Sequence, residues 1–328
     1  MTCPFCQHVN RGGLPAGLEA ERQFWPRLEA TVVYLKHEQQ LSYERLSQTL
    51  REVCGVELTE GGASAIIERA GQLAAAPAAA IRGAVTQSQI IQSDETSARV
   101  SGANWWPWVF RSVAGVYHTI APTRSAAVIA EIMGESRAEV WVSDCFSAQL
   151  KAPTTEFQLC LAHQLRALQR VLDADPQCAW AAAMQQLFRT AIHLHRRFDK
   201  AEPELTLTGY VRRAMQMEAQ LDDLLARRVR YGAAQHLRER FLRHREKLLA
   251  FLHYPGVPPT NNASEQALRG SVIHRKVTNG FRSAWGARAY AALQSVIATA
   301  RHKGAPVFET LVNLMGSPVL HYLGPSDP

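Results

Sequence analysis

Three carboxylates in this sequence have surroundings that could bring their side chains to one point. Asp94 lies in the run 89–100, whose β-branched and apolar residues predict a buried strand. Asp144 ends a second apolar run, and Glu265 opens a helix-like segment. Two strands and a helix would then each supply a carboxylate oxygen. Such ligands suit Mg²⁺ and similar hard cations and paired-metal phosphodiester chemistry, so the pattern predicts an enzyme that cuts nucleic acid.

Each carboxylate also has an ordinary structural explanation. Asp94 could form a turn at a strand end, and Asp144 could cap the segment that follows it. Glu265 and Arg269 have the spacing of a common ion pair on a helix. Taken singly, each of these explanations is the better one. The order strand, strand, helix is what favours a shared site.

A Cys pair near the N-terminus has half the ligands of a structural zinc site. Cys3 and Cys6 are separated by two residues, but a complete site needs four ligands and no second pair follows at the usual distance. His8 follows Cys6 too closely to serve easily. We therefore expect residues 1–18 to be a disordered remnant of a zinc-binding module that does not bind Zn²⁺ tightly. The other cysteines are scattered, which predicts reduced thiols.

Composition and charge narrow the class of protein. The chain has 328 residues and is 47% hydrophobic, which is ample for a packed core. Residues 1–159 hold 13 Lys and Arg against 16 Asp and Glu, residues 160–253 hold 16 against 10, and residues 254–328 hold 7 against 3. A one-sided positive field is typical of a surface that binds a polyanion, although solvated helix faces would give the same count.

The sequence has no segment that would take it into or across a membrane. No apolar run approaches the roughly twenty residues needed to span a bilayer, and the N-terminus lacks the zones of a signal peptide. We therefore expect no membrane partner and a cytoplasmic location.

The N-terminal third has a helical pattern. Apolar residues recur at helical spacing from residue 19 to about residue 85, with Ser42 and Thr59 placed to cap helices and Gly55 placed to end one. Two helices joined by a short turn are compatible with a DNA-binding helix-turn-helix. A plain helical hairpin fits slightly better, because Gly61 and Gly62 weaken a recognition helix.

The period then changes to that of strands. The runs 90–100, 105–114 and 116–121 predict three antiparallel strands. A helix over 125–133 and strands at 140–143 and 157–161 follow. By analogy, this order, with an acidic residue on the first and fourth strands, is that of the ribonuclease-H-like α/β fold.

The next ninety or so residues would interrupt that fold. Residues 163–253 are helical in pattern and basic, with breaks at Pro176, Pro203 and Gly209, and they are a candidate DNA clamp. After them Asn261 or Asn262 is placed to cap the helix that carries Glu265.

Several short motifs together resemble the insertion-sequence 66 family of transposases, bacterial enzymes of the DDE type. The matching segments, in family order, are 93–96 (SDET), 105–109 (WWPWV), 140–144 (VWVSD), 160–163 (CLAH) with Arg166, 261–269 (NNASEQALR), 275–276 (RK) and 280–283 (GFRS). Each motif alone is weak, but all of them in order are highly specific.

The resemblance implies a chemistry and residues that perform it. The catalytic carboxylates fall on Asp94, Asp144 and Glu265, which would hold two Mg²⁺ or Mn²⁺ ions. The implied reaction is hydrolysis at the ends of a mobile element, followed by attack of the freed 3′-hydroxyl on target DNA. His163 and Asn262 would lie near the site.

Basic residues in the same region are candidates for contacts with DNA phosphates. Arg269 follows Glu265 by one helical turn, and Arg275 and Lys276 come soon after it. In the helical insertion the candidates are Arg227, Arg228 and Arg230.

We therefore predict four regions: the zinc-module remnant at 1–18, a helical region at 19–86, a ribonuclease-H-like domain at 87–315 and a tail at 316–328. The domain would be interrupted by helices at about 164–254. The family usually has a longer N-terminal region with a complete zinc module, so the chain is expected to be truncated.

Two functional hypotheses remain open. One is an active transposase, with double-stranded DNA and helper proteins as partners, acting as a homo-oligomer at the bacterial nucleoid. The alternative is a catalytically idle, DNA-binding remnant of such an enzyme; a resolvase or ribonuclease on the same fold is a distant third.

Overall fold

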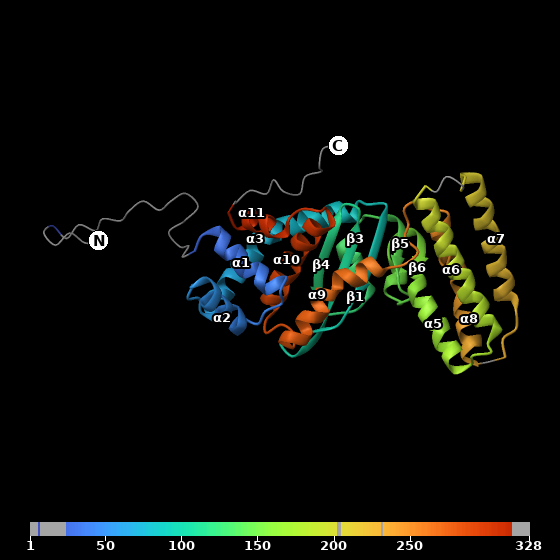
Figure 1. Cartoon of the computed structure of the whole chain (residues 1–328), viewed down its shortest axis with the longest axis horizontal. Helices are drawn as coiled ribbons and strands as arrows, with labels where there is room; N and C mark the ends of the chain where they lie inside the picture. The colour runs from blue at the N-terminus through green and yellow to red at the C-terminus, as the bar shows by residue number, and fades with distance from the viewer. Residues whose placement is uncertain (1–5, 7–23, 202–204, 231, 317–328) are drawn as a thin grey trace.

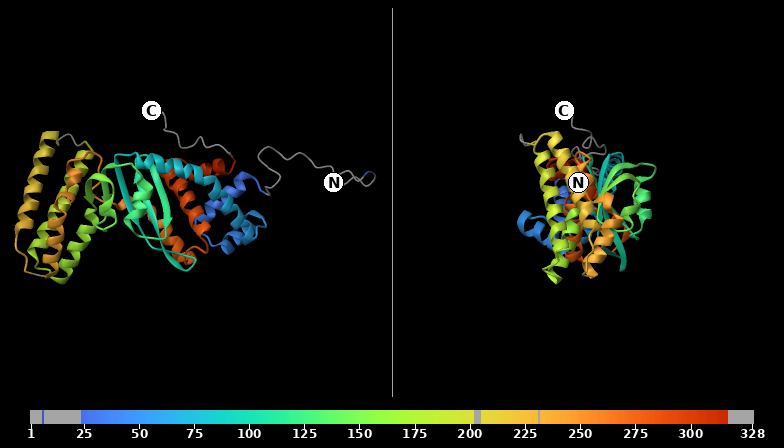
Figure 2. Two further views of the ribbon diagram at one scale, coloured as in Figure 1. Left: turned by 180° about the vertical axis from the view of Figure 1, so that it is seen from behind. Right: turned by 90° about the vertical axis from the view of Figure 1, so that its right-hand side faces the viewer.

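A central sheet joins two helical regions in an elongated molecule (Figure 1). The computed structural model describes residues 6, 24–201, 205–230 and 232–316. The N-terminal helices α1–α3 lie at one end of the sheet and the helices α5–α8 at the other, and the view from behind agrees (Figure 2). Within the described ranges, no helix combines the length and apolar character required to cross a bilayer.

Local sequence signals set the ends of the N-terminal helices. These are α1 (Pro26–His37), α2 (Tyr43–Cys54) and α3 (Glu60–Thr86). The predicted caps are confirmed, because Ser42 Oγ accepts from the Arg45 N–H and Thr59 Oγ from the Gly62 N–H. Gly55 ends α2 in the left-handed conformation, with φ of 66°.

The sheet has six strands in a mixed arrangement. They are β1 (Ile90–Glu95), β2 (Ala98–Val100), β3 (Ala103–Ser112), β4 (Gly115–Ala121), β5 (Ala138–Ser143) and β6 (Thr154–Leu159). β3 pairs antiparallel with β1, β2 and β4, whereas β1, β5 and β6 pair in parallel, so the order across the sheet is β4-β3-β1-β5-β6 with β2 beside β3. The run 90–100, predicted as one strand, is two strands because Thr96 and Ser97 interrupt it.

Successive side chains along the strands point to opposite faces of the sheet, so each face packs into a different hydrophobic core. Ile91, Trp108, Phe110 and Trp141 are fully buried on one face, in a cluster that includes side chains of α3 and of α4 (Ala126–Met133). On the other face, Val109 and Val116 pack against Leu268 of the helix α9 (Asn262–Thr278). Truncating a buried Trp or Phe costs on the order of 3–5 kcal/mol, so the aromatic residues of the first face anchor the sheet.

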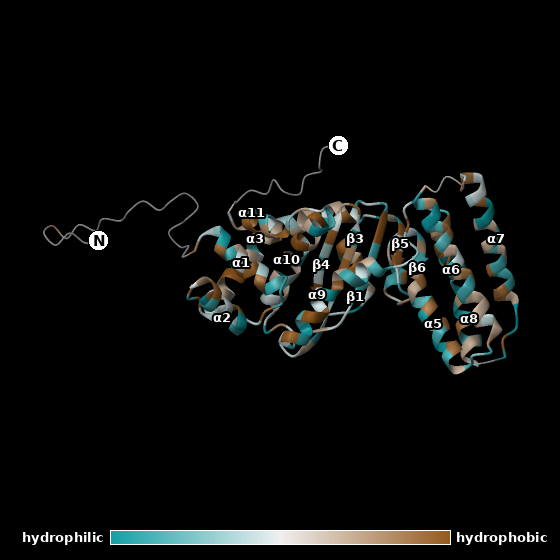
Figure 3. Ribbon diagram, in the orientation of Figure 1, coloured by the Kyte–Doolittle hydropathy of each residue, from teal (hydrophilic) through white to brown (hydrophobic). Residues whose placement is uncertain are grey.

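The helices after β6 form a lobe with its own core. They are α5 (Leu161–Ala174), α6 (Ala179–Asp199), α7 (Leu207–Ala226) and α8 (Gly232–Arg243), with short 3₁₀ turns at Arg245–Lys247 and Ala250–Leu252. Hydrophobic and hydrophilic residues alternate along these helices, and the hydrophobic ones pack together with Val140, Val142 and Leu159 of the sheet (Figure 3). The predicted break at Gly209 is wrong, because Thr206 caps α7 and places Gly209 in its first turn.

The last three helices return to the sheet and to the N-terminal region. They are α9 (Asn262–Thr278), α10 (Ala284–His302) and α11 (Val307–Gly316), and a third 3₁₀ turn lies at Gln149–Lys151. α10 runs along the edge strand β4, where Ser295 Oγ and Thr299 Oγ1 accept from the N–H groups of His118 and Val116. These bonds satisfy donors that an edge strand would otherwise leave unpaired.

Candidate active site

Asp94 and Asp144 lie side by side where two neighbouring parallel strands end. Gln92 of β1 pairs with Val142 of β5, and each aspartate comes two residues further along the chain, Asp94 within β1 and Asp144 directly after β5. Adjacent strands are roughly 4.8 Å apart, and equal spacing from a registered pair puts both side chains on the same face. That face is the one that Val140, Val142 and α9 occupy. The strand pairing thus brings two of the three predicted carboxylates together.

Glu265 reaches the same place from the first turn of α9. α9 packs across β1 and β3. One residue before it, Asn261, is bonded to β1 and to the start of α5. Its side-chain amide donates to the Ser93 carbonyl at 2.7 Å, and its backbone N–H donates to Cys160 Sγ at 3.1 Å. Asn261 is fully buried, so the start of α9 is fixed against the end of β1 and the start of α5.

The electrostatics of Asp94 reflect the convergence of the three carboxylates. Burial, together with the negative charges of Glu95, Asp144 and Glu265, raises the pKa of Asp94 to about 7, although a hydrogen bond from the Glu95 N–H acts in the opposite direction. In the part of the chain that the structure describes, no ion pair to Asp94 is found. A divalent cation would relieve this repulsion, and three carboxylates are the oxygen donors that Mg²⁺ and Mn²⁺ prefer, so the residues fit such a metal.

Cationic and polar groups hold Glu265 from the side of α5. Arg166 Nη2 donates to Glu265 Oε1 at 3.1 Å, and His163 Nδ1 lies 3.5 Å from the same oxygen. Burial lowers the pKa of His163, which favours the neutral ring. Ligand atoms of Cys160, His163 and Glu265 all lie within 4.8 Å of one another. The prediction that His163 lies near the carboxylates is therefore consistent with this geometry.

A second glutamate supports the sheet beneath the site. Glu95 is buried on the opposite face of β1, where Arg124 donates to it at 2.6 and 2.9 Å and Gln149 donates at 2.5 Å. Gln149 also accepts from the indole N–H of Trp141 at 3.1 Å. Burial raises the pKa of Glu95, and the hydrogen bonds from Gln149 and Arg124 only partly offset this rise. This network fixes the ends of β1 and β5, where the aspartates lie.

Arginines line a groove that leads away from Asp144. A cavity of about 250 Å³ beside Asp144 is lined by Arg124, Arg170 and Arg240, and it shares Arg170 and Arg240 with a second cavity of about 390 Å³ between α5 and α8. Arg243 extends the second cavity. We call these two cavities the basic groove. Its positive lining at one end of the carboxylate cluster suits a phosphate backbone.

The predicted DNA-contacting residues are only partly gathered around this site. Arg269 and Lys276 are exposed along α9, whereas Arg275 is held by hydrogen bonds to the Ser97 carbonyl and hydroxyl. The three arginines of the insertion (Arg227, Arg228, Arg230) lie between α7 and α8 and line neither cavity of the basic groove.

Two further predictions concern the cap of α9 and the zinc pair. Asn262 is exposed at the start of α9, and the expected cap is wrong: Asn261 occupies the N-cap position, but its side chain bonds Ser93 instead of the helix. Of the predicted zinc pair, Cys3 lies outside the described residues, while Cys6 is exposed.

Sequence reasoning missed several residues that shape the site. The sequence does not point to Gln149 or to the Glu95–Arg124 pair, and it offers Asn261 only as a helix cap. It also does not single out Arg170, Arg240 and Arg243 among the arginines of the basic insertion. A buried polar pair far apart in the chain leaves no periodic signal. Only the position of Glu95 directly after Asp94 could have drawn attention to it.

Comparison with known proteins gave one family. The family model described as "Transposase IS66 family" matches residues 21–289, which is most of the chain and includes all three carboxylates. No curated protein matches the sequence.

Proposed function

This chain belongs to the IS66 family of transposases, and we propose that it contributes to transposition by cleaving DNA strands and transferring them to new sites. Asp94, Asp144 and Glu265 would be its catalytic carboxylates. A function related to transposition follows from membership of this family.

One observation carries this proposal: the three carboxylates meet on one face of the sheet. Asp94 on β1 and Asp144, directly after the adjacent parallel strand β5, occupy matching positions, and the third carboxylate is in a helix whose first turn is tied to β1. Partial burial of three neighbouring carboxylates costs stability and is typical of functional sites. The strand order and directions also support a ribonuclease-H-like catalytic domain that α5–α8 interrupt.

Asp94, Asp144 and Glu265 would hold two Mg²⁺ or Mn²⁺ ions. When bound, these ions would supply Lewis-acid activation of the attacking oxygen and charge stabilisation of the leaving oxygen. The chain's own residues do the positioning. Arg166 and His163 orient the Glu265 carboxylate, and Asn261 keeps α9 at a fixed distance from β1.

The path for DNA is supported by the distribution of positive charge. The basic groove starts at Asp144 and is formed by helices of the lobe, so a strand entering it would place a phosphate near the carboxylates. Arg269 and Lys276 offer contacts on the other side, along α9. Arg275 would join them after leaving Ser97, and Arg227, Arg228 and Arg230 would add sequence-independent contacts on the lobe.

Action on chromosomal DNA would place the protein at the nucleoid in the cytoplasm. We further propose a homo-oligomer on DNA and helper proteins from the same element. The helices α2 and α3 could serve as a helix-turn-helix or as a plain hairpin.

Strand cleavage and strand transfer by the purified chain test the proposal. The substrate is duplex DNA with the terminal repeats that flank the coding gene, in Mg²⁺ or Mn²⁺. We expect Asp94→Asn, Asp144→Asn and Glu265→Gln each to abolish both reactions while leaving the melting temperature and DNA affinity nearly unchanged. Asp173→Asn, at an exposed position on α5, is the matched control and should retain activity.

The outcomes separate the two functional hypotheses. A variant of the three with near-normal cleavage would remove that residue from the site. DNA binding by the wild type without cleavage in either metal would favour the idle remnant.

A further inference from the structure

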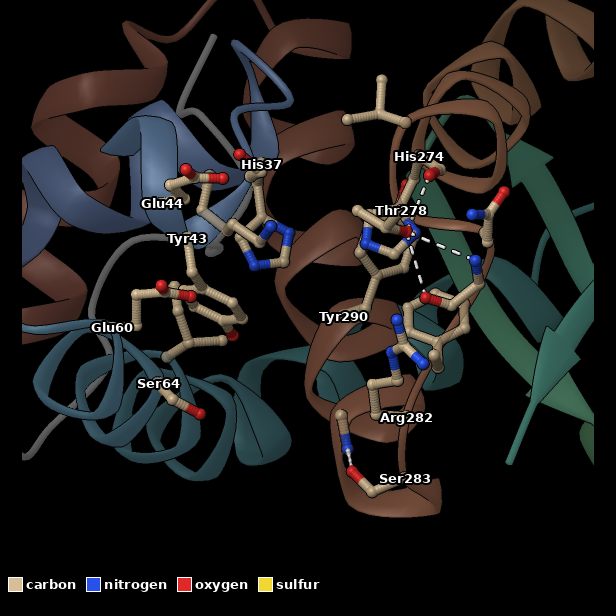
Figure 4. A pocket seen from close by; sticks show the side chains of 18 of the residues that line it. His37, Tyr43, Glu44, Glu60, Ser64, His274, Thr278, Arg282, Ser283 and Tyr290 are labelled. Carbon is tan, nitrogen blue, oxygen red and sulfur yellow. Dashed lines mark hydrogen bonds between the residues drawn. The ribbon is translucent and has the colours of Figure 1, made fainter. Parts of the chain in front are cut away.

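A third cavity lies away from the carboxylates and from the basic groove, where the N-terminal helices meet the turn between α9 and α10. Its volume is about 590 Å³, within the range of roughly 300–1,000 Å³ typical of ligand pockets. In Figure 4, Tyr43 lies on one side of the cavity and Thr278 and Arg282 lie on the other, and the His37 ring contacts the Tyr290 ring at 5.3 Å between centres. None of the residues assigned above to metal or DNA lines it.

The floor of this cavity has a polar group with unmet hydrogen bonds. His37 is 3% exposed, and neither of its ring nitrogens has a partner. Burial, together with the nearby His274 and Lys36, lowers the pKa of His37 to about 3. The ring is therefore neutral and offers one donor and one acceptor. A buried group of this kind normally has partners, so its state points to a ligand that supplies them.

Aromatic rings form one wall of the cavity. His274 stacks on Phe281 with ring centres 4.5 Å apart, and Tyr290 contacts both rings at 4.8 and 5.2 Å. Tyr43 and Trp285 add rings to the lining. His274 and Tyr290 are buried behind this wall, so the half-buried rings of Tyr43, Phe281 and Trp285 are the ones that can stack on a nucleobase. Such stacking is worth roughly 1–3 kcal/mol per base in complexes with single strands.

The rim carries charge of both signs. Arg282 is exposed on one side, and Glu44 and Glu60 are exposed on the other. The N-terminal ends of α2, α3 and α10 also border the cavity, through Ser42, Glu60 and Ser283. Helix N-termini and an arginine favour a phosphate, and carboxylates accept hydrogen bonds from exocyclic amino groups of bases. A ligand with an anionic group and a base matches this rim better than a free anion does.

α9 connects this cavity with the carboxylates. Glu265 is in its first turn, and Thr278, at its last residue, lines the cavity; these thirteen steps span roughly 20 Å. One exposed face of the helix runs between them and consists of Asn262, Gln266, Arg269, Ile273 and Lys276. A DNA strand advances about 3.4 Å per nucleotide, so this distance corresponds to roughly six nucleotides.

We propose that this cavity accepts one unstacked nucleotide of the DNA strand that follows α9 from the carboxylates, with the base against the aromatic wall and His37, and the phosphate at Arg282. The inference rests on the proposed function, because it assumes that DNA lies at the carboxylates. Extruding a base costs a few kcal/mol, which stacking and the two hydrogen bonds to His37 offset.

The test places the fluorescent base 2-aminopurine singly at each position from one to ten nucleotides from the cleaved end of terminal-repeat duplexes. The full chain is added in EDTA, so that unstacking is measured without cleavage. We expect the emission to rise several-fold at one position, about six nucleotides from the end, and to stay near the free-duplex level elsewhere.

Three variants connect that signal to the cavity. Ser64→Trp fills the cavity from α3 and should abolish the rise. Arg282→Ala removes the phosphate contact at the rim and should weaken binding roughly tenfold and reduce the salt slope by about one. Arg288→Ala is the matched control, because this arginine is exposed on α10 and does not line the cavity; the rise should persist in it. Melting curves identify a variant that fails to fold, and Arg282→Ala, at an exposed position, remains as the second test.

The results distinguish this inference from the proposed catalytic function. A local rise in emission without cleavage in Mg²⁺ would support the cavity and overturn the catalytic proposal. Cleavage without a rise at any position would overturn the cavity and leave catalysis standing. A rise that Ser64→Trp and Arg282→Ala both leave unchanged, or no binding of DNA at all, would also overturn the cavity.

Discussion

Replacing Gly71 by Ala should destabilise the protein, although alanine is the better helix former. Gly71 lies inside α3 where that helix crosses α10, and a Cβ atom placed there would be 2.4 Å from the Cβ atom and 2.8 Å from the Cα atom of Ala289. Carbon atoms normally approach to about 3.5–4.0 Å, so the two helices would have to separate by roughly 1 Å. Overpacking of this kind costs typically about 1–3 kcal/mol.

The expected magnitude combines this cost with helix propensity. Because the new Cβ atom would meet a neighbouring helix far inside contact distance, the upper part of that range, about 2–3 kcal/mol, applies. Alanine gains about 0.8–1.0 kcal/mol over glycine within a helix, so the net loss in the free energy of unfolding should be about 1–2 kcal/mol. Gly83 is the matched control on the same helix, because a Cβ atom there has no neighbour within 4 Å. Gly83→Ala should therefore stabilise the protein, by up to about 1 kcal/mol.

Urea unfolding of Gly71→Ala and of Gly83→Ala measures the free energy of unfolding, which should fall in the first variant and rise in the second. The double variant Gly71→Ala, Ala289→Gly removes one of the colliding atoms. Its loss in the free energy of unfolding should therefore be smaller than the sum of the losses in the single variants Gly71→Ala and Ala289→Gly. If Gly71→Ala proves as stable as the wild type, or more stable, the close approach of α3 and α10 is wrong.

Three further predictions concern the site, the lobe and the N-terminus. His163→Ala should slow single-turnover cleavage by about tenfold to a hundredfold while leaving DNA affinity and the melting temperature unchanged, because it acts through Glu265; a normal cleavage rate would remove it from the site. Replacing Arg227, Arg228 and Arg230 by Ala should reduce the salt slope of DNA binding by up to about 2.7, equally for all sequences; an unchanged slope would show that they do not contact DNA. Metal analysis should find no near-stoichiometric Zn²⁺ in the chain; Zn²⁺ that disappears in the variant Cys3→Ala, Cys6→Ala would contradict this.

The periodic parts of the fold could be predicted from the sequence, because one buried face leaves a local signal. The strand around Asp94 and the capped helix after Thr59 are examples. The split at Thr96 and Ser97 could not, since the alternation continues through it and the break depends on pairing with β3.

The candidate site shows the same division. Asp94 and Asp144 could be selected because each follows an apolar run. The role of Asn261 was mistaken for a cap, since asparagine before a helix usually bonds the helix itself. Here a buried carbonyl at Ser93 competes for that amide, and only the folded chain reveals that competition. The cavity at His37 is likewise formed by segments more than 200 positions apart.

The tie between Asn261 and Ser93 has a consequence for synthesis on the ribosome. The two residues are separated by 168 positions, so both aspartates emerge long before the glutamate that completes their set. Chains fold from the N-terminus as they are made, and contacts of such long range form late. α10, which covers the β4 edge, emerges later still. A nascent or prematurely terminated chain would therefore lack the third carboxylate and could not perform the proposed cleavage. The DNA being transcribed nearby would then stay intact until almost the whole chain has been translated.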